Sequence, residues 1–391
     1  MHPLAERLWH TVPKIGQDLV ASSIDRLRGV TPPPFPTIQS EKPIRLMVGP
    51  VNYAGQGFRW CRIAETTGKV SATNFVHVEN NPLGYPADYT LTWRTAEHSR
   101  AWQKSMLQEL SQNYTHVLIE ACFPILGGRY SGDMRRQIAE MQDAGLRVGI
   151  VGHGNDVRLP SRHAAREKWS PFHTDEWVPP ERLESVVAAN LELIEELRLP
   201  TFVSTAGLLV DIPWAHLLPV IIDQDRWAPH TQPLLRDRIR VVHAPTNPIA
   251  KGTTFIAPIA RKLHDEGLIE YVELQGIPNE QMPSVFAEAD VVLDQFRGGD
   301  YGVAACETMA SGRIVVAHID DQVRGEVERR AGMPLPIVSA TIDRVEEVIR
   351  DIARDRTHYQ SVAAQGPRFV ATLHGGNYSR DALMRHFLEA E

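Results

Sequence analysis

The chain has 391 residues, of which 43% are hydrophobic and 23% charged, a balance that is typical of a globular protein rather than a disordered one. Its 41 Lys and Arg residues against 48 Asp and Glu residues give a formal net charge of −7, which argues against nucleic acid or anionic lipid as the partner. Single hydrophobic cores stop growing at roughly 250–300 residues, so we expect two domains.

An amphipathic helix is predicted over residues 4–28, where apolar side chains recur on one side. Pro13 interrupts it, and a proline-rich linker follows at 31–36. Because its acidic and basic residues balance, we expect the helix to dock on the body of the protein rather than on a membrane. Residues 1–37 therefore form a separate N-terminal segment in this interpretation.

From residue 44 onward, short apolar runs alternate with helical stretches, which predicts an α/β fold with parallel sheets wrapped by helices. The predicted helices include 132–144, 180–197, 253–266 and 342–354. The predicted strands are 44–48, 73–78, 115–120, 147–151, 200–204, 239–243, 270–275, 290–294, 313–317 and 335–338.

The first predicted strand leads into a loop that contains Gly55 and Gly57, and a helix is expected from Phe58. This order is typical of the first strand, loop and helix of a Rossmann-like unit. It is not a dinucleotide fingerprint, because Trp60 stands where the third glycine is expected. A plain strand-to-helix turn fits the same residues.

The strand over 147–151 is followed by His153, which has a glycine on each side. Ligands of open α/β sheets bind outside the carboxyl ends of the strands, so we expect His153 to face the cleft. Its expected role is to contact a ligand in that cleft, with a purely structural histidine as the alternative. Asp156 and Arg158 are expected to form a local ion pair, with ligand contact as a second possibility.

Two blocks in the second half suit a nucleotide diphosphate. The first, HAPTNPIAKGT, starts at His243 and runs from a β-branched strand into a helix. A helix start offers free N–H groups and a lysine beside it offers positive charge, so Lys251 is the cation that we expect to bind the diphosphate. An ordinary surface lysine followed by a turn glycine fits the local sequence equally well.

The second block, GGDYGVAACETMASGRIVV, starts at Gly298. Its glycines allow the backbone to approach a ligand closely, and the small residues after them predict a thin, closely packed helix. That helix contains Glu307, which has no obvious ion-pair partner within one turn. A buried carboxylate needs hydrogen-bond donors, and the vicinal hydroxyls of a ribose supply them. A structural carboxylate that bonds loop backbone is the alternative.

These blocks resemble the C-terminal half of retaining glycosyltransferases with the GT-B fold, the large family numbered four. The matching stretches are Lys251-Gly252, the strand, loop and short helix over 273–290, and the run from Glu307 to Val316. The resemblance extends over nearly all of the chain from Ile44, with its specific motifs in 241–317.

The resemblance implies two Rossmann-like domains with parallel sheets that face each other across a cleft. Their expected bounds are 38–222 for the acceptor domain and 223–374 for the nucleotide-sugar domain, and residues 375–391 form a helix that crosses back to the first domain. It implies a hexosyltransferase that retains the anomeric configuration and needs no metal or cofactor. The implied donor is a UDP- or GDP-linked sugar, and the implied acceptor is a glycan, a cell-envelope component or a small molecule.

Site residues follow from the same resemblance. The implied catalytic residues are His153, Lys251 and Asp300, and the implied acceptor contacts are Asp156 and Arg158. The implied donor contacts are Gly55, Gly57, His243, Thr246, Lys251, Gly252, Gly276, Ile277, Gly299, Asp300, Tyr301, Gly302, Val303 and Glu307.

Two departures from the family pattern stand out. The family has a pair of glutamates, and aligning the second with Glu307 places Gly299 at the first, sugar-facing position, where Asp300 is the nearest substitute. The arginine before the lysine is also missing. We expect its phosphate contact to come from Arg297 or Arg313, or from the hydroxyl and amide donors of Thr246 and Asn247.

Two alternatives to a transferase remain at this point. One is a non-catalytic nucleotide-sugar-binding protein of the same fold, which the glycine at position 299 favours. The other is a sugar-nucleotide epimerase, which would need acid and base side chains that face the sugar. The run from Asp223 to Asp225 resembles an Asp-x-Asp metal motif, but its position after an interdomain strand argues against that role.

The cysteines Cys61, Cys122 and Cys306 lie far apart in apolar stretches, so they predict neither a zinc site nor a disulfide framework. No segment reaches the ~18 consecutive apolar residues that a membrane-spanning helix needs, and the N-terminus is unlike a secretory signal. We therefore expect a cytoplasmic protein.

Overall fold

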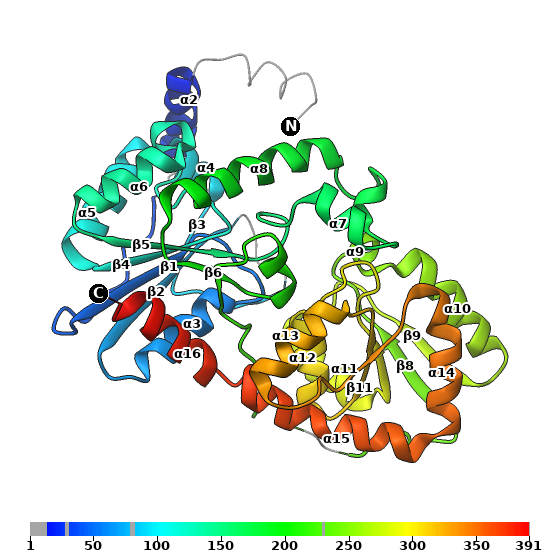
Figure 1. The fold of residues 1–391 in the computed structure, drawn as a ribbon. Coiled ribbons are helices and arrows are strands. Elements are labelled where there is room, and N and C mark those ends of the chain that lie inside the picture. The colour runs from blue at the N-terminus through cyan, green and yellow to red at the C-terminus, as the bar shows by residue number, and fades with distance from the viewer. Residues whose placement is uncertain (1–13, 28–30, 79–82, 229–230, 391) are drawn as a thin grey trace.

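The computed structural model describes residues 14–27, 31–78, 83–228 and 231–390. The chain forms two α/β halves, each built on a parallel sheet, which lie side by side (Figure 1). The predicted α/β class with two parallel sheets is confirmed.

The N-terminal sheet has the strand order β3-β2-β1-β4-β5-β6-β7, and all of its pairs are parallel. Its strands are short and mostly buried on both faces, as expected where helices cover a parallel sheet. They are β1 (Ile44–Gly49), β2 (Val70–His77), β3 (Tyr89–Leu91), β4 (His116–Glu120), β5 (Arg147–Gly152), β6 (Thr201–Val203) and β7 (His216–Leu217).

The C-terminal sheet is also parallel, in the order β12-β11-β10-β8-β9. Chain order reverses between β8 and β10, so the carboxyl ends of these two strands form a topological switch point, where open α/β sheets bind ligands. The strands are β8 (Ile239–His243), β9 (Ile269–Glu273), β10 (Val291–Leu293), β11 (Ile314–Ala317) and β12 (Ile337–Ser339).

Helices flank both sheets (Figure 1). Those of the first half are α2 (Lys14–Leu27), α3 (Gln56–Glu65), α4 (Trp93–His98), α5 (Arg100–Asn113), α6 (Met134–Asp143), α7 (Pro160–Arg166) and α8 (Pro180–Leu197). The remaining helices are α9 (Pro248–Lys251), α10 (Thr253–Asp265), α11 (Met282–Glu288), α12 (Val303–Ala310), α13 (Asp321–Ala331), α14 (Val345–Arg354), α15 (Arg356–Leu373) and α16 (Asn377–Leu383).

Helix α12 packs closely on α15, because small residues let their backbones approach. A Cβ on Gly366 would lie 2.4 Å from the carbonyl oxygen of Met309. The end of the described chain then returns to the first half, where α16 packs on α3. Leu383 and Phe387 are fully buried there in one core cluster with Leu46 of β1.

Helix α2 lies on α4, as expected for a segment that docks on the body of the protein. The buried Asp18 carboxylate pairs with His98 at 3.2 Å and with Arg100 at 3.0 Å. The first part of the predicted helix over 4–28 falls outside the described residues. Among the described residues, no helix combines the length and the apolar character that a membrane crossing needs.

All ten predicted strands occur, with ends that differ by up to three residues. Strands β3 and β7 are missing from the prediction because each is too short to show a pattern. Helix α15 is missing as well, since Gly366 and Pro367 interrupt its helical sequence pattern. Tertiary packing of α15 on α12 therefore overrides weak local propensity.

Candidate functional site

A cavity of about 1090 Å³ lies between the two halves. Its walls are the loops at the carboxyl ends of strands from both sheets, which is where ligands bind in this class of fold. The first half contributes loop residues that follow β1, β2, β5 and β6, and the second half contributes those that follow β8 and β9, together with the start of α12.

The start of α12 opens into this cavity. Gly302, Val303 and Ala304 line it, and Gly302 is the extended residue that precedes the helix. The first N–H groups of a helix have no partner inside the helix, and its dipole favours an anion at this end. Lys251 lines the same cavity and forms an ion pair with the buried Asp294. Together these groups form an anion-binding corner.

Glu307 lies one helical turn into α12 and also lines the cavity. Only 6% of it is exposed, and its carboxylate has no hydrogen-bond partner among the described residues. Burial raises the pKa of Glu307 to about 8, although the charges of Arg59, Arg226 and Lys251 lower it. A buried carboxyl group without donors is available to a ligand that brings hydroxyl groups.

His153 lines the opposite wall, at the end of β5. Its ring lies between Tyr53 and Trp60, at centroid distances of 4.3 Å and 5.5 Å. Its Nε2 lies 3.2 Å from Oε1 of the fully buried Glu120, and Nδ1 has no partner among the described residues. Burial raises the pKa of Glu120, while its contact with His153 opposes that rise.

Eight residues implied by the resemblance line this cavity together. They are His153, Thr246, Lys251, Gly276, Ile277, Gly302, Val303 and Glu307.

The other seven implied donor contacts lie outside the cavity lining. His243 is fully buried, with Nδ1 at 2.8 Å from the Leu293 carbonyl oxygen and Nε2 at 2.8 Å from the Thr253 hydroxyl. Gly252 provides the left-handed residue between α9 and α10. Both residues join β8 to α10, and neither lines the cavity.

Gly55 and Gly57 have structural positions too. Gly55 has φ +69° at the start of α3, and a Cβ there would meet Pro86 at 3.3 Å. A Cβ on Gly57 would lie 3.0 Å from Oε2 of Glu120. The second glycine therefore makes room for the carboxylate that contacts His153, instead of bringing the backbone close to a donor.

The second sequence block divides between two places. Gly302, Val303 and Glu307 line the cavity, whereas Gly299, Asp300 and Tyr301 lie outside the lining. The buried Asp300 accepts hydrogen bonds from the N–H groups of Gly207 at 2.9 Å and Tyr301 at 2.8 Å. The hypothesis that Asp300 faces the sugar is therefore not supported by its position.

Tyr301 is buried, and its hydroxyl lies 3.1 Å from His374 Nε2. Gly299 has φ +64°, and a Cβ on it would lie 2.2 Å from Oε1 of Glu167. A carboxylate from the first half therefore occupies the space that a side chain at position 299 would need.

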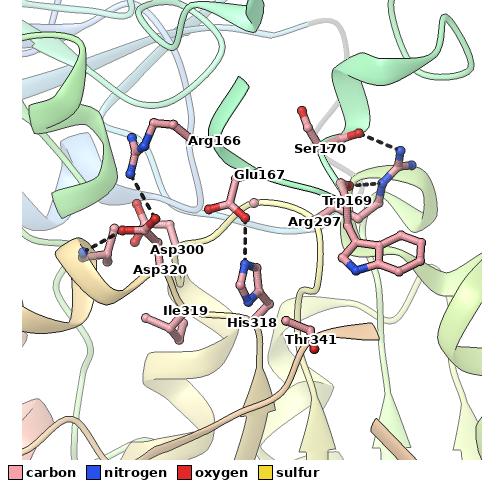
Figure 2. Close-up of polar contacts among 12 residues, drawn as sticks. Arg166, Glu167, Trp169, Ser170, Arg297, Asp300, His318, Ile319, Asp320 and Thr341 are labelled. Atoms are coloured by element: carbon pink, nitrogen blue, oxygen red, sulfur yellow. Dashed lines mark hydrogen bonds and ion pairs between the residues drawn. The ribbon is translucent and has the colours of Figure 1, made fainter. Parts of the chain in front are cut away.

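Glu167 belongs to a second contact between the halves, which we call the polar interface. It joins residues 158–173 of the first half to 297–300 and 318–320 of the second (Figure 2). Glu167 pairs with His318 at 2.7 Å, and Arg166 pairs with Asp320 at 3.1 Å. The Glu167 carboxylate raises the pKa of His318.

Arg297 of the second half bonds to the first half on the other side of this interface. Its guanidinium donates to the carbonyl oxygens of Trp169 at 2.9 Å and Ser170 at 3.0 Å (Figure 2). Arg313, the other arginine expected to reach a phosphate, instead contacts Thr231 and the Ala287 carbonyl oxygen. Neither lines the cavity, so the expectation of a phosphate contact from these two arginines is not supported.

The expected pair of Asp156 and Arg158 does not form. Asp156 accepts hydrogen bonds from the N–H groups of His153 at 3.0 Å and Gly154, and so holds the loop after β5 in shape. Arg158 turns to Asp300 at 3.8 Å across the polar interface. Neither residue lines the cavity.

No protein-family model and no curated protein sequence matches the chain. Among solved structures, sucrose-phosphate synthase from Thermosynechococcus elongatus is similar over 87% of this chain and 96% of its own, with TM-score 0.55 and 14% identity. HepE from Anabaena, in complex with UDP and glucose, is similar over 86% and 97%, with TM-score 0.53 and 12% identity. Both are GT-B glycosyltransferases. The chain has the GT-B fold.

Sequence reasoning missed two features of this GT-B cleft. Glu120 ends a buried strand, and the strand-end rule that singles out His153 applies to it equally. Arg59 of α3 and Arg226 act on the carboxyl group of Glu307, and no local motif marks either of them. Only the approach of the two halves brings these arginines together.

Proposed function

We propose that the protein is a glycosyltransferase that moves a sugar from a nucleoside-diphosphate sugar to a hydroxyl group of an acceptor. The observation that carries this proposal is the anion-binding corner of the cavity, where the start of α12 meets Lys251 beside the unpartnered Glu307. The GT-B fold, and the UDP and glucose bound to the similar HepE, support the same conclusion.

Each part of the donor has a matching group. The free N–H groups of α12 and the Lys251 ammonium suit a diphosphate, whose charge grows as it leaves. Glu307 suits the ribose, because two vicinal hydroxyls can donate to one carboxyl group. The donor is a UDP- or GDP-linked hexose in this proposal, and no metal is required since Lys251 supplies the positive charge.

The reaction breaks the bond between the anomeric carbon and the diphosphate oxygen, and the electron pair leaves with the diphosphate. The acceptor oxygen forms the new bond on the same face, and its proton goes to the departing phosphate oxygen. Retention by same-face attack is favoured because Glu307 is the only carboxylate that lines the cavity among the described residues. A covalent glycosyl–enzyme intermediate would need a second carboxylate.

His153 is the residue proposed to contact the transferred sugar. Because Glu120 accepts from Nε2–H in this proposal, Nδ1 is left as a hydrogen-bond acceptor for a sugar hydroxyl. Closure of the cleft would exclude the water that hydrolyses the donor.

The test is a panel of UDP-, GDP- and ADP-linked sugars, measured for thermal shift and for release of free nucleotide with and without acceptors. A shift with acceptor-dependent release supports the transferase. A shift without release indicates a binding protein, which the lack of a sugar-facing carboxylate would explain, and an interconverted donor indicates an epimerase. Absence of any shift across the panel overturns the proposal.

A further inference from the structure

The part of the cavity wall that the first half contributes with its described residues is uncharged. The described lining residues between Asn52 and Val220 include no Lys, Arg, Asp or Glu. The only such residues in the described lining are Lys251 and Glu307, and both belong to the second half. A phosphate or carboxylate placed against these residues would lose part of its hydration without gaining a cation from the lining of this wall.

His77 adds no charge to this wall. It ends β2 and lines the cavity. Burial lowers the pKa of His77 to about 3, so its ring is neutral. Both of its ring nitrogens are buried without a hydrogen-bond partner. The ring packs edge-on against Phe75 at 4.8 Å and Trp93 at 4.9 Å, so it presents an aromatic surface.

From His77 an aromatic path leads to the protein surface. Trp93 contacts Phe123 at a centroid distance of 5.7 Å, and each of these two side chains is 37% exposed. Tyr53 lines the cavity on its other side, over His153, and is 45% exposed. Exposed aromatic side chains that continue from the lining of a pocket commonly mark a binding surface.

We infer that the acceptor is an uncharged oligosaccharide, whose sugar rings stack on Tyr53 inside the cavity and on the exposed pair Trp93 and Phe123 beside His77. The apolar C–H face of a sugar ring complements an aromatic face, while its hydroxyl groups stay hydrated or bonded. An uncharged wall accepts such a chain and disfavours phosphorylated sugars and uronic acids. This inference rests on the proposed function, because it assigns the acceptor of that reaction.

The experiment measures binding by saturation-transfer NMR, which needs no turnover. Maltotriose and cellotriose are compared with glucose 6-phosphate and glucuronic acid, in the wild-type protein and in the Trp93→Ala and Phe123→Ala variants. The matched control is Trp214→Ala, since Trp214 is 40% exposed but stacks with Arg198, whereas Trp93 contacts His77 of the cavity lining. Thermal unfolding confirms that each variant is folded.

We expect at least one neutral trisaccharide to bind, and its Kd to rise about tenfold in Trp93→Ala, as for an aromatic side chain at the centre of a contact. Trp214→Ala should bind like the wild type. Tighter binding of the charged sugars, or equal binding by the Trp93 and Trp214 variants, overturns the inference.

The two proposals fail in different ways. If the trisaccharide binds through Trp93 but no nucleotide sugar is bound or consumed, the transferase proposal fails and the oligosaccharide site stands. If nucleotide release is stimulated only by a phosphorylated or carboxylated acceptor, the transferase stands and the uncharged acceptor is wrong.

Discussion

The two halves of the molecule face each other in two places, which differ in whether their charged groups have partners. In the polar interface, Glu167 is paired with His318 and Arg166 with Asp320. In the cavity, Glu307 has no partner among the described residues and the start of α12 faces open space. Paired charges stabilise the contact between two surfaces, whereas polar groups without partners around a cavity are available to bind a ligand.

The boundary between these two regions falls inside one glycine-rich block. Gly299 to Tyr301 contribute to the interface and the buried core, whereas the residues that line the cavity are Gly302, Val303, Ala304 and Glu307. Adjacent residues of one motif can therefore have unrelated roles. The following changes test whether the cavity and the interface are as separate as their contacts suggest.

The largest effect is expected from removing the cavity cation. Because Lys251 pairs with the buried Asp294, the variant Lys251→Met is combined with Asp294→Asn so that no buried charge is left alone. We expect nucleotide release to fall about 100-fold, as when one electrostatic contact to a leaving group is lost. Arg297→Ala is the control from the interface, and equal losses of release in both variants would contradict the separation.

The next effect concerns Gly299. In Gly299→Ala, a Cβ would sit 2.2 Å from Glu167 Oε1 at a residue with φ +64°. We expect a loss of about 1–3 kcal/mol in the free energy of unfolding, measured by urea denaturation. Gly302→Ala is the matched control, because nothing lies within 4 Å of its Cβ position. Combining Gly299→Ala with Glu167→Ala should recover part of the loss, and strict additivity would disprove the clash.

A pH-dependent effect is expected from Glu307. Its pKa rises from 4.5 to about 8 in the folded protein, so the folded state keeps a proton that the unfolded state has released. Stability should therefore fall as pH rises across this window, by up to about 1.4 kcal/mol per pH unit. Glu307→Gln should remove that slope, and parallel stability curves for the two proteins would rule out a buried protonated carboxyl group.

The smallest effect is expected from Glu167→Gln. Glu167 raises the pKa of His318 above its usual 6.5, and Asp320 and Asp321 add to the rise. The stabilisation is complete below about pH 6.5 and is lost as pH increases through the raised pKa. The variant should be less stable by about 1 kcal/mol near pH 6, and the difference should shrink at alkaline pH. A constant difference at all pH values would show that packing rather than charge is lost.

Much of the fold could be predicted because its strands are apolar runs with clear ends. The position of Lys251 and Glu307 in the cavity lining could be predicted too, because each lies in a motif whose local structure directs it toward the cleft. The position of the Asp300 side chain could not be predicted in this way. Its carboxylate accepts a hydrogen bond from the Gly207 N–H of the other half, and no local pattern predicts a contact so distant in sequence.

Glu120 illustrates a second limit. A single glutamate at the end of a strand belongs to no recognisable motif. Its role comes from His153, which follows a neighbouring strand and has Nε2 at 3.2 Å from Oε1 of Glu120. His243 is the opposite case, because a conspicuous strand-end histidine is absorbed into the hydrogen bonding of β8 and α10. Side-chain partners, rather than position along the chain, decide between the two outcomes.

The return of α16 to the first half also has a consequence for synthesis of the protein. Phe387 and Leu383 complete a core that begins with Leu46, so part of one face of the first-made sheet stays uncovered while the ribosome translates the entire second half. Exposed apolar strands of this kind invite aggregation or chaperone binding. Nascent chains that stall before residue 377 should therefore bind chaperones longer than released ones do.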